Sequence, residues 1–491
     1  MIKLHARTWL VPFYLYVSVG LIAGCKQGEN SSPPSPKVET KVASPSSDQA
    51  TVPGDSHSSV ETVADIPDPG AATVGMSEEL RAEQQLQGIE AGSVAAPLGA
   101  SSGDVLIEGK AFDPYIIPVS EEACAERASH WVWESGRCRR LNFAEYCQQG
   151  SEASPDIRHA VQVVRQLNES CISAWNRLRN LQTLNLAQYD LMTVYPFAGL
   201  SNLTHLDLSS NKIQDISPLS SMTGLVAVRL NKNRITDARA VGRLTHLQIL
   251  DIADNKLKSL YPLEGARQLT VLDVSRTTGV DALSLSKLTR LKVLWLVGNG
   301  VEDISFLTAL SQLVELNLTL NRVHDLSALA KLSHLQTLKL SENFLKSLSS
   351  LYFVSQQQGE QGVQNELENI ALLSLQTLHV DKNEIEYLTP LSKMVRLRDL
   401  SVKDNRVKEI SPLQSLVYLE KVNLSGNPFL DISSLRYHPS LQELDLRACK
   451  VKLFDDLTTL RALIRLDVRG CDTALDAAKL FGTRKIDVFQ D

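Results

Sequence analysis

The chain repeats a unit of 22 residues along more than half of its length, and this period constrains its fold more than any other feature. The unit is clearest in the stretch NLTHLDLSSNKIQDISPLSSMT, from Asn202 to Thr223. One step, between Leu335 and Leu375, is 40 residues long, so 18 residues are inserted there. The first leucine of each unit is Leu181, Leu203, Leu225, Leu247, Leu269, Leu291, Leu313, Leu335, Leu375, Leu397, Leu419, Leu441 or Leu463. The period predicts about 13 stacked coils across residues 181–472.

Each unit carries the pattern of a short strand with one buried face. Leu206 and Leu208 alternate with polar residues, and a strand turns successive side chains to opposite sides. A single strand of this length is not stable alone. Stacked on its neighbours, it gains backbone hydrogen-bond partners on both sides, and the leucines merge into one core.

An asparagine follows the strand in most units. We expect its side chain to bond the buried backbone of the bend, which otherwise lacks hydrogen-bond partners. The slot holds Asn211, Asn233, Asn255, Asn299, Asn321, Asn343, Asn383, Asn405 and Asn427. Tyr189 and Thr277 replace the asparagine, which predicts an imperfect ladder at those two turns.

The second half of each unit predicts a short helical return. Pro218, Pro262, Pro390 and Pro412 stand near its first position, where a missing N–H costs little. The 22-residue unit with its DISPL return resembles the leucine-rich repeats of bacterial internalins and of a eukaryotic phosphatase-regulator class, over roughly 60% of the chain. The resemblance implies an α/β solenoid: a right-handed horseshoe with a parallel concave β-sheet and short 3₁₀ or helical convex returns. It is weak evidence for any particular partner.

The N-terminus predicts export. Residues 1–24 combine Lys3 and Arg7 with an apolar run that ends in Ile-Ala-Gly before Cys25, as in a secretory signal. The cysteine after small residues makes this segment resemble a bacterial lipoprotein signal, which implies cleavage before Cys25 and acylation of its side chain. An ordinary signal peptide or an uncleaved anchor remains the alternative. Lys26, where lipoproteins retained at the inner membrane commonly carry Asp, favours the outer membrane.

Residues 25–105 follow as an expected disordered stalk, because they are rich in Ser, Pro, Ala, Gly and charge and contain no aromatic residue after Cys25. The net charge of −6 and the lack of a basic stripe argue against nucleic-acid binding. We therefore expect a lipid-anchored monomer in the bacterial cell envelope, on either the periplasmic or the exposed side.

Residues 106–180 are predicted to form a cysteine-rich, partly helical cap on the first coil. Four cysteines within about 50 residues suggest two disulfides in an oxidising compartment, and we favour Cys124 with Cys138 and Cys147 with Cys171. Three pairings are compatible with the sequence, and a zinc site is a weaker alternative. A helix over residues 156–168 is expected to cover the open end of the solenoid.

At the other end, residues 473–491 are expected to form a C-terminal cap, with KIDVFQD as a closing strand. Cys449 and Cys471 occupy the asparagine slot of two successive units. Two buried thiols are the favoured interpretation. A disulfide is the alternative, because stacked strands lie ~4.8 Å apart.

The sequence offers no catalytic or metal-binding constellation, so we expect neither an enzyme nor a cofactor. It lacks the nucleophile-elbow, zinc-protease, phosphate-loop and dinucleotide-binding motifs. Asp207, Asp251 and Asp273 share one column of the predicted sheet. A cation between them is an alternative to solvated strand positions, which we favour.

A partner is expected on the concave face, where the middle repeats become apolar. A solvent-facing Trp within an apolar patch, flanked by charges, is typical of a binding hot spot. The predicted binding residues are Ile249, Val271, Val293, Trp295, Val297 and Leu320, with Arg229, Asp251, Asp273 and Lys339 around them. The alternative is that Ile and Val merely suit a strand and that Trp295 lies flat on its neighbours.

Two further features each allow two interpretations. Arg447, Arg465 and Arg469 gather in the last two repeats, a charge gradient that would orient a partner or serve only solubility. The inserted residues, placed near 355–372, are rich in Gln and Gly and predict a mobile loop that is either tolerated or functional.

The leading hypothesis is therefore a membrane-anchored, protein-binding solenoid that acts in adhesion or as an envelope scaffold. The alternative is a regulatory subunit or inhibitor of a secreted or periplasmic enzyme, as the phosphatase-regulator resemblance implies.

Overall fold

A computed structural model of the chain describes residues 130–134, 137–165, 169–277, 281–358, 364–370, 372–472 and 476–490. The chain divides into two units, Met1–Ile107 and Glu108–Asp491, and every described residue belongs to the second. The predicted signal segment, the lipidation site Cys25 and the stalk up to residue 105 lie outside the described residues.

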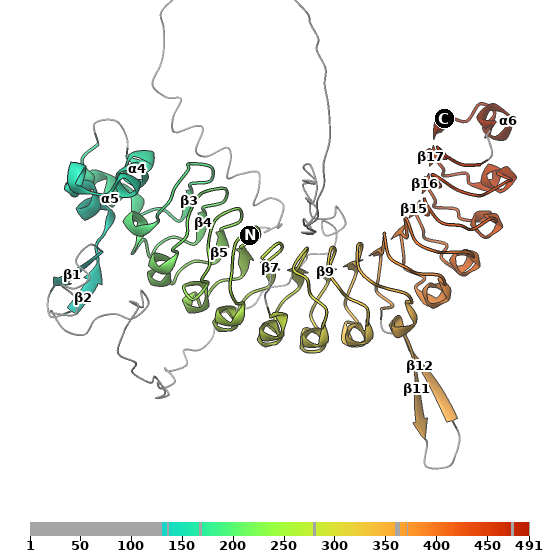
Figure 1. Cartoon of the computed structure of the whole chain (residues 1–491), viewed down its shortest axis with the longest axis horizontal. Helices are drawn as coiled ribbons and strands as arrows, with labels where there is room; N and C mark the ends of the chain where they lie inside the picture. Colours follow the sequence, from blue (N-terminus) through green and yellow to red (C-terminus); the bar gives the residue numbers. More distant parts are fainter. Residues whose placement is uncertain are drawn as a thin grey trace, which may run out of the picture. The chain divides into compact units, whose positions relative to one another are not determined.

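The described part of the chain is built around one parallel sheet of 14 three-residue strands (Figure 1). The strands follow one another in sequence order, and each pairs with the next in the register set by the 22-residue period, for example Leu206 with Val228. The strands are β3 (Thr183–Asn185), β4 (His205–Asp207), β5 (Ala227–Arg229), β6 (Ile249–Asp251), β7 (Val271–Asp273), β8 (Val293–Trp295), β9 (Glu315–Asn317), β10 (Thr337–Lys339), β13 (Thr377–His379), β14 (Asp399–Ser401), β15 (Lys421–Asn423), β16 (Glu443–Asp445), β17 (Arg465–Asp467) and β18 (Asp487–Phe489). This confirms the predicted solenoid with its parallel sheet.

Short 3₁₀ turns return the chain along the outer side of the curve, while the strands line the inner side (Figure 1). Proline stands at the start of several turns, as at Pro218. The turns are η3 (Tyr195–Phe197), η4 (Ser217–Ser221), η5 (Val241–Arg243), η6 (Tyr261–Gly265), η7 (Ala282–Lys287), η8 (Ser305–Ala309), η9 (Ser327–Lys331), η10 (Ser349–Leu351), η11 (Thr389–Lys393), η12 (Ser411–Ser415), η13 (Ser433–Leu435) and η14 (Asp455–Thr459).

The core is a continuous column of leucines between the strands and the returns. Leu203, Leu208 and their counterparts in the following repeats are fully buried. Burying a leucine side chain contributes about 1.5–3 kcal/mol, so the array is stabilised by neighbours rather than by any single coil.

The asparagine ladder is formed as the sequence predicts. Asn321 donates from Nδ2 to the carbonyls of Leu296 and Leu318, both at 2.9 Å, and to Thr319 at 3.2 Å. Its Oδ1 accepts from the N–H groups of Val301 at 2.9 Å and Asn299 at 3.1 Å. One side chain thus satisfies backbone groups of two coils.

The ladder is weaker where the sequence departs from asparagine. Thr277 retains a single carbonyl contact, from Oγ1 to Val274 O at 2.7 Å. Its side chain provides no acceptor for the N–H of Leu257 in the preceding coil, the group that an asparagine would accept from. The imperfect turn predicted at this position is present.

The described part of the N-terminal cap contains the helices α3 (Phe143–Gln149), α4 (Pro155–Val164) and α5 (Cys171–Leu178), and the hairpin β1 (Trp131–Glu134) with β2 (Arg137–Arg140). A 3₁₀ turn, η2 (Gly150–Glu152), joins α3 to α4. Helix α4 ends at Val164, before the predicted boundary at residue 168. Asn142 caps α3 reciprocally with Glu145, and this pairing sets its first turn.

A disulfide joins α3 to α5 within the cap. Cys147 and Cys171 are bonded, with Cα atoms 5.6 Å apart, and this is the pairing favoured from the sequence. Cys138 is also disulfide-bonded, but Cys124, its predicted partner, lies outside the described residues.

The C-terminal cap ends the sheet with helix α6 (Ala477–Phe481) and strand β18, which pairs with β17 as expected for KIDVFQD. Cys449 and Cys471 form a disulfide between adjacent coils, with Cα atoms 4.5 Å apart. The favoured prediction of two free thiols was therefore wrong. The Cα separation of neighbouring parallel strands falls within the bridging range of a disulfide.

The insertion is a β-hairpin rather than the predicted loop. Strands β11 (Tyr352–Gln358) and β12 (Gln364–Ile370) pair antiparallel, with Tyr352 opposite Ile370. The hairpin leaves the array after η10, on the return side (Figure 1). Its strands lack the alternation of apolar and polar residues by which a strand is recognised in a sequence. The Gln- and Gly-rich composition therefore predicted a loop instead.

Candidate partner-binding face

The concave face presents the side chains that do not enter the core, in columns that run across the sheet. Each column takes one residue from each strand, ~4.8 Å from the next. The column formed by the last residue of each strand contains Asn185, Asp207, Arg229, Asp251, Asp273, Trp295, Asn317, Lys339, His379, Ser401, Asn423, Asp445, Asp467 and Phe489. The columns that enter the core remain rich in leucine, whereas in this column the residue type differs between almost all neighbouring strands.

The apolar patch predicted in the middle of this face is only partly exposed. Ile249, Val271 and Val297 are half-buried, and Leu320 is 46% exposed. Val293, expected on the surface, is only 3% exposed, so that part of the prediction was wrong. It stands in register between Val271 and Glu315, and packing within this column leaves little of the side chain at the surface.

Trp295 lies across its neighbouring strand instead of standing out from the sheet. Its Nε1 donates to Oε1 of Glu315 at 2.9 Å, and Glu315 is 2% exposed. The indole is half-buried. This geometry corresponds to the alternative interpretation of Trp295, although part of the ring still contributes to the surface.

Leu320 has a positive φ of +60°, as do the residues at the same position of most repeats, for example Ser210 and Lys232. The left-handed region favours glycine, and a branched aliphatic residue there is rare. The equivalent position holds Gly298 in the preceding repeat and Glu342 in the next, both also at positive φ. Leucine at this turn places an exposed apolar side chain at the rim of the concave face.

Charged residues surround the N-terminal side of this patch. Arg229 Nη1 lies 3.5 Å from Oδ2 of the buried Asp207. Burial, and then the neighbouring Asp273 carboxylate, raise the pKa of Asp251 to about 7. Burial also raises the pKa of Asp273, against hydrogen bonds from Ser275 that lower it. The aspartate column is thus half-buried rather than freely solvated. Lys339, the remaining predicted residue, is half-buried in the same column beyond Asn317.

Across the part of the chain that the structure describes, no group of three His, Cys, Asp or Glu side chains is arranged to hold a metal ion. Among the same residues, no helix has the length and apolar character needed to cross a membrane.

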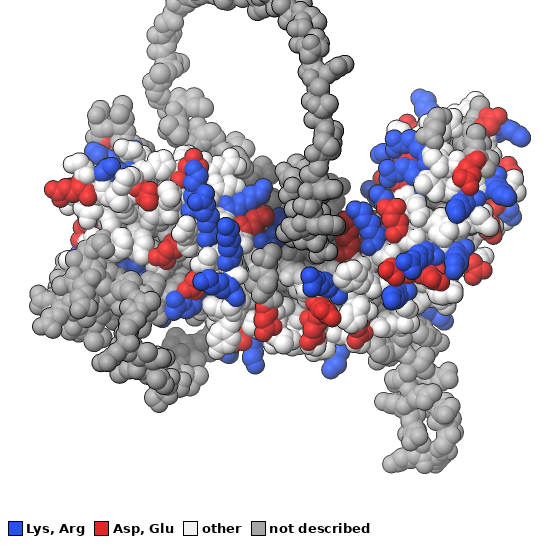
Figure 2. Space-filling view, viewed as in Figure 1, with Lys and Arg blue, Asp and Glu red and all other residues white. Residues whose placement is uncertain are grey.

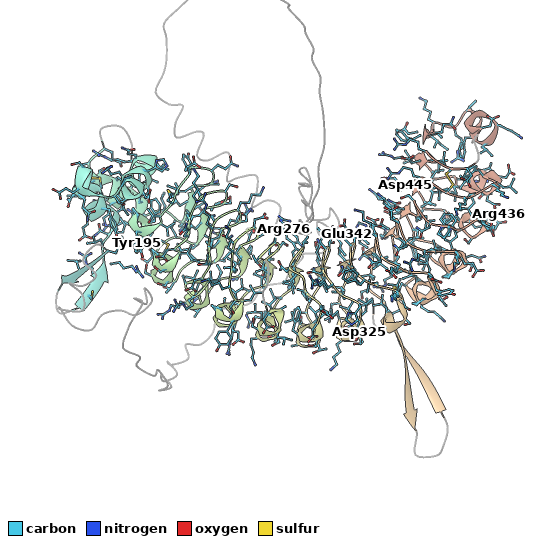
Figure 3. The ribbon with its side chains drawn as sticks, in the orientation of Figure 1. Tyr195, Arg276, Asp325, Glu342, Arg436 and Asp445 are labelled. Carbon is cyan, nitrogen blue, oxygen red and sulfur yellow. A yellow bond between two sulfur atoms is a disulfide. The ribbon has the colours of Figure 1, made fainter. Side chains whose placement is uncertain are left out.

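A second concave feature lies over strands β13–β17, where the sheet is hollowed. The hollow has a volume of about 340 Å³ and is lined almost entirely by polar and charged side chains. Figure 2 shows basic and acidic side chains mixed over this end of the solenoid, and in Figure 3 Asp445 points to the inner side while Arg436 lies on the outer side. The sequence indicates a charge gradient through Arg447, Arg465 and Arg469 but predicts no site in this region.

Ion pairs order most of the charges in the hollow. Arg447 contacts Asp445 at 2.6 Å, and Arg469 contacts Asp467 at 2.5 Å. Further pairs join Lys421 to Glu443 at 3.0 Å and His379 to Asp399 at 3.2 Å. Each pair is at least partly exposed and contributes little stability, but together they fix the positions of the side chains.

Arg465 differs from these residues because it lies over an aromatic ring without an ion pair to any carboxylate among the described residues. Its guanidinium carbon lies 4.9 Å from the ring centroid of Phe489, and that of Arg469 lies 5.6 Å from the same centroid. Phe489 comes from the closing strand β18 and is 38% exposed. The C-terminal cap thus supplies part of the hollow's margin.

The comparisons agree with this geometry. The family model described as "Leucine Rich repeats (2 copies)" matches residues 179–221, 201–241 and 289–331. The fold is a leucine-rich-repeat solenoid. No curated protein matches the chain in sequence.

Solved structures of leucine-rich-repeat proteins are similar to this solenoid. An internalin from Listeria monocytogenes (InlF) is 25% identical, with a TM-score of 0.57, and the match covers 64% of this chain and 88% of the internalin. A leucine-rich-repeat protein of Leptospira interrogans is 24% identical, with a TM-score of 0.52, over 69% of this chain and 93% of that protein. The second likeness concerns the fold alone.

Proposed function

We propose that this leucine-rich-repeat protein binds another protein through its concave face and is held at a bacterial cell envelope by an acylated Cys25. Leucine-rich-repeat domains typically mediate protein–protein interaction, and internalin-type repeats are generally non-enzymatic binding scaffolds. Our proposal adds that the concave face is the binding surface, that an acylated Cys25 anchors the protein, and that the protein acts in adhesion or as an envelope scaffold.

The observation that carries the proposal is the contrast between core and concave columns. Along 14 consecutive strands the buried positions stay aliphatic, whereas the last strand position runs through Asp, Arg, Trp, Lys, His and Phe. Stacking demands only the buried leucines. The concave columns can therefore vary to match a particular partner, and Leu320 places an exposed apolar side chain at the rim of this face.

The similarity to an internalin supports a role in binding another protein. Adhesion to a host or prey surface and scaffolding within the envelope both fit, and both use a tethered monomer. The lipid tether is proposed from the sequence of residues 1–25. Substituting Cys25→Ser should release the mature protein from membranes, and mass spectrometry of the N-terminal peptide should find two or more acyl chains in the parent.

The concave face is tested by affinity capture from envelope and target-cell extracts. Leu320→Gly is the informative variant, because it removes an exposed side chain at a position whose positive φ glycine adopts readily, and its melting temperature is measured alongside. Trp295→Ala tests the middle of the face, with its melting temperature measured alongside because Glu315 loses a donor. Tyr261→Ala, an exposed residue of the return turn η6, is the matched control.

We expect Leu320→Gly and Trp295→Ala each to weaken capture of the same partner at least tenfold, while Tyr261→Ala leaves it unchanged. Unchanged capture by both concave variants would remove the middle of this face from the binding surface. A captured hydrolase whose activity changes on binding would instead support the regulatory alternative.

A further inference from the structure

Arg465 is the cation of the C-terminal hollow that is left without an acidic partner. Among the described residues that line the hollow, Lys421, Arg447 and Arg469 each contact a carboxylate within 3.0 Å. Arg465 instead lies against Phe489, at 4.9 Å from the ring centroid. Its register neighbour Glu443 is already engaged by Lys421. The guanidinium is therefore ordered by a ring rather than by a carboxylate, in a residue that lines the hollow.

A guanidinium in this state is suited to a carboxylate. Arginine offers planar, forked donors that match a carboxylate with two hydrogen bonds, and stacking on a ring reduces the side-chain freedom that binding would otherwise remove. The partly exposed Phe489 ring adds an apolar contact beside the charge. The combination favours an acidic side chain next to an apolar one.

The rest of the hollow limits how much negative charge a ligand can bring. Its lining contains five carboxylates, Asp381, Asp399, Glu443, Asp445 and Asp467, against four Lys and Arg side chains. A polyacidic ligand would be repelled, whereas a single carboxylate at Arg465 would not. The volume of about 340 Å³ accommodates a few side chains rather than a domain.

The direction of the sheet sets the shape of the ligand. The hollow crosses five parallel strands, which at ~4.8 Å spacing amount to ~20 Å, or about six residues of extended chain. We propose that the hollow over β13–β17 binds an extended segment of the protein partner, and that Arg465 on Phe489 recognises one acidic side chain with an adjacent apolar residue. This deepens the proposed function and rests on it.

The test uses a displayed library of random octapeptides selected on the purified full chain. We expect enrichment of peptides with Asp or Glu beside an apolar residue. Arg465→Gln should abolish that enrichment, and Arg465→Lys, which keeps the charge without the fork, should reduce it. Arg461→Gln is the matched control, because it removes the same charge from the same repeat at an exposed position outside the hollow.

An enriched peptide, synthesised and labelled, gives the quantitative readout by fluorescence polarisation. Arg465→Gln should raise its dissociation constant at least tenfold, and replacing its acid with the amide should do the same in the parent protein, with no further loss when both changes are combined. Phe489→Leu should weaken binding less, since it keeps the charge and the forked donors of Arg465 and removes only the ring that orders them.

Three results would overturn the inference. They are selection without an acidic preference, an acidic preference unchanged in Arg465→Gln, and Arg465-dependent binding of inorganic phosphate without any selected peptide, which would indicate a small-anion site. None of these decides the capture experiment with Leu320→Gly, so the concave face and this assignment fail separately.

Discussion

The asparagine ladder allows a stabilising substitution to be designed at Thr277, where the chain departs from its own pattern. Asn321 illustrates the hydrogen bonds that an asparagine makes at this position of the repeat. Its Oδ1 accepts from Val301 N at 2.9 Å and Asn299 N at 3.1 Å, and its Nδ2 donates to three backbone carbonyls. The Thr277 hydroxyl keeps one backbone contact, to Val274 O, and a long one of 3.5 Å to Asn299 Oδ1. The N–H of Leu257, which corresponds to that of Val301, has no acceptor among the described residues, and Leu257 is 2% exposed.

Thr277→Asn should supply that acceptor and restore donors to the bend. Each added hydrogen bond contributes about 1 kcal/mol net, and a buried N–H without a partner costs about 1–3 kcal/mol, so a gain of about 1–2 kcal/mol is expected. The reciprocal change, Asn321→Thr, keeps the contact to Leu318 O but loses both acceptor bonds, at a cost of about 2–4 kcal/mol.

Native-state hydrogen exchange measures this effect at the right place. In Thr277→Asn the amide of Leu257 should be protected roughly 5- to 30-fold more strongly, while amides in distant repeats change little. Asn321→Thr should lower protection around Val301 by a larger factor. Unchanged exchange at Leu257 in Thr277→Asn, or a loss of protection there, would refute the view that the side chain in this slot satisfies the backbone of the preceding coil.

Two further predictions concern the charge and the disulfide of the array. The pKa of Asp251 is raised from an ordinary value of 3.8 to about 7, so the folded protein binds this proton more tightly than the unfolded chain and stability falls as pH rises from about 4 to about 7. Asp251→Asn should therefore stabilise the protein at pH 8 but not at pH 4, and thermal unfolding curves with the reverse order would contradict this. The Cys449–Cys471 bond closes a loop of 22 residues, so replacing both cysteines with serine should cost about 3 kcal/mol in denaturant unfolding. If non-reducing peptide mapping finds two free thiols in the parent protein, the Cys449–Cys471 disulfide is absent and this prediction is wrong.

Much of the fold follows from the sequence because a solenoid repeats one local problem. The leucine spacing alone predicts the strand, its register against the next coil and the buried column, as Leu206 opposite Val228 illustrates. The asparagine slot predicts its own bonding, because a tight bend leaves only a few backbone groups in need of partners. These features depend on contacts between residues that are separated by a constant number of positions in the sequence.

The features that sequence reasoning missed depend on pairs that no period describes. Val293 is buried and Trp295 is laid onto Glu315 by packing among particular side chains of the concave columns. Arg465, which lines the hollow, lies against Phe489 because β18, a strand that lacks the leucine pattern of the repeats, pairs with β17. The disulfide between Cys449 and Cys471 could have been anticipated from the distance between strands, but the asparagine slot also tolerates a buried thiol.

The most direct test of the account is photo-crosslinking on cells that produce the protein, with a photoreactive amino acid placed at Leu320 on the concave rim or at Tyr261 on the return turn. Both positions are exposed, at 46% and 69%, so either side chain can reach a bound protein. We predict a specific adduct from position 320 and none from position 261. An adduct that forms only from position 261 would show that the outer side of the solenoid holds the partner and would contradict a concave binding face.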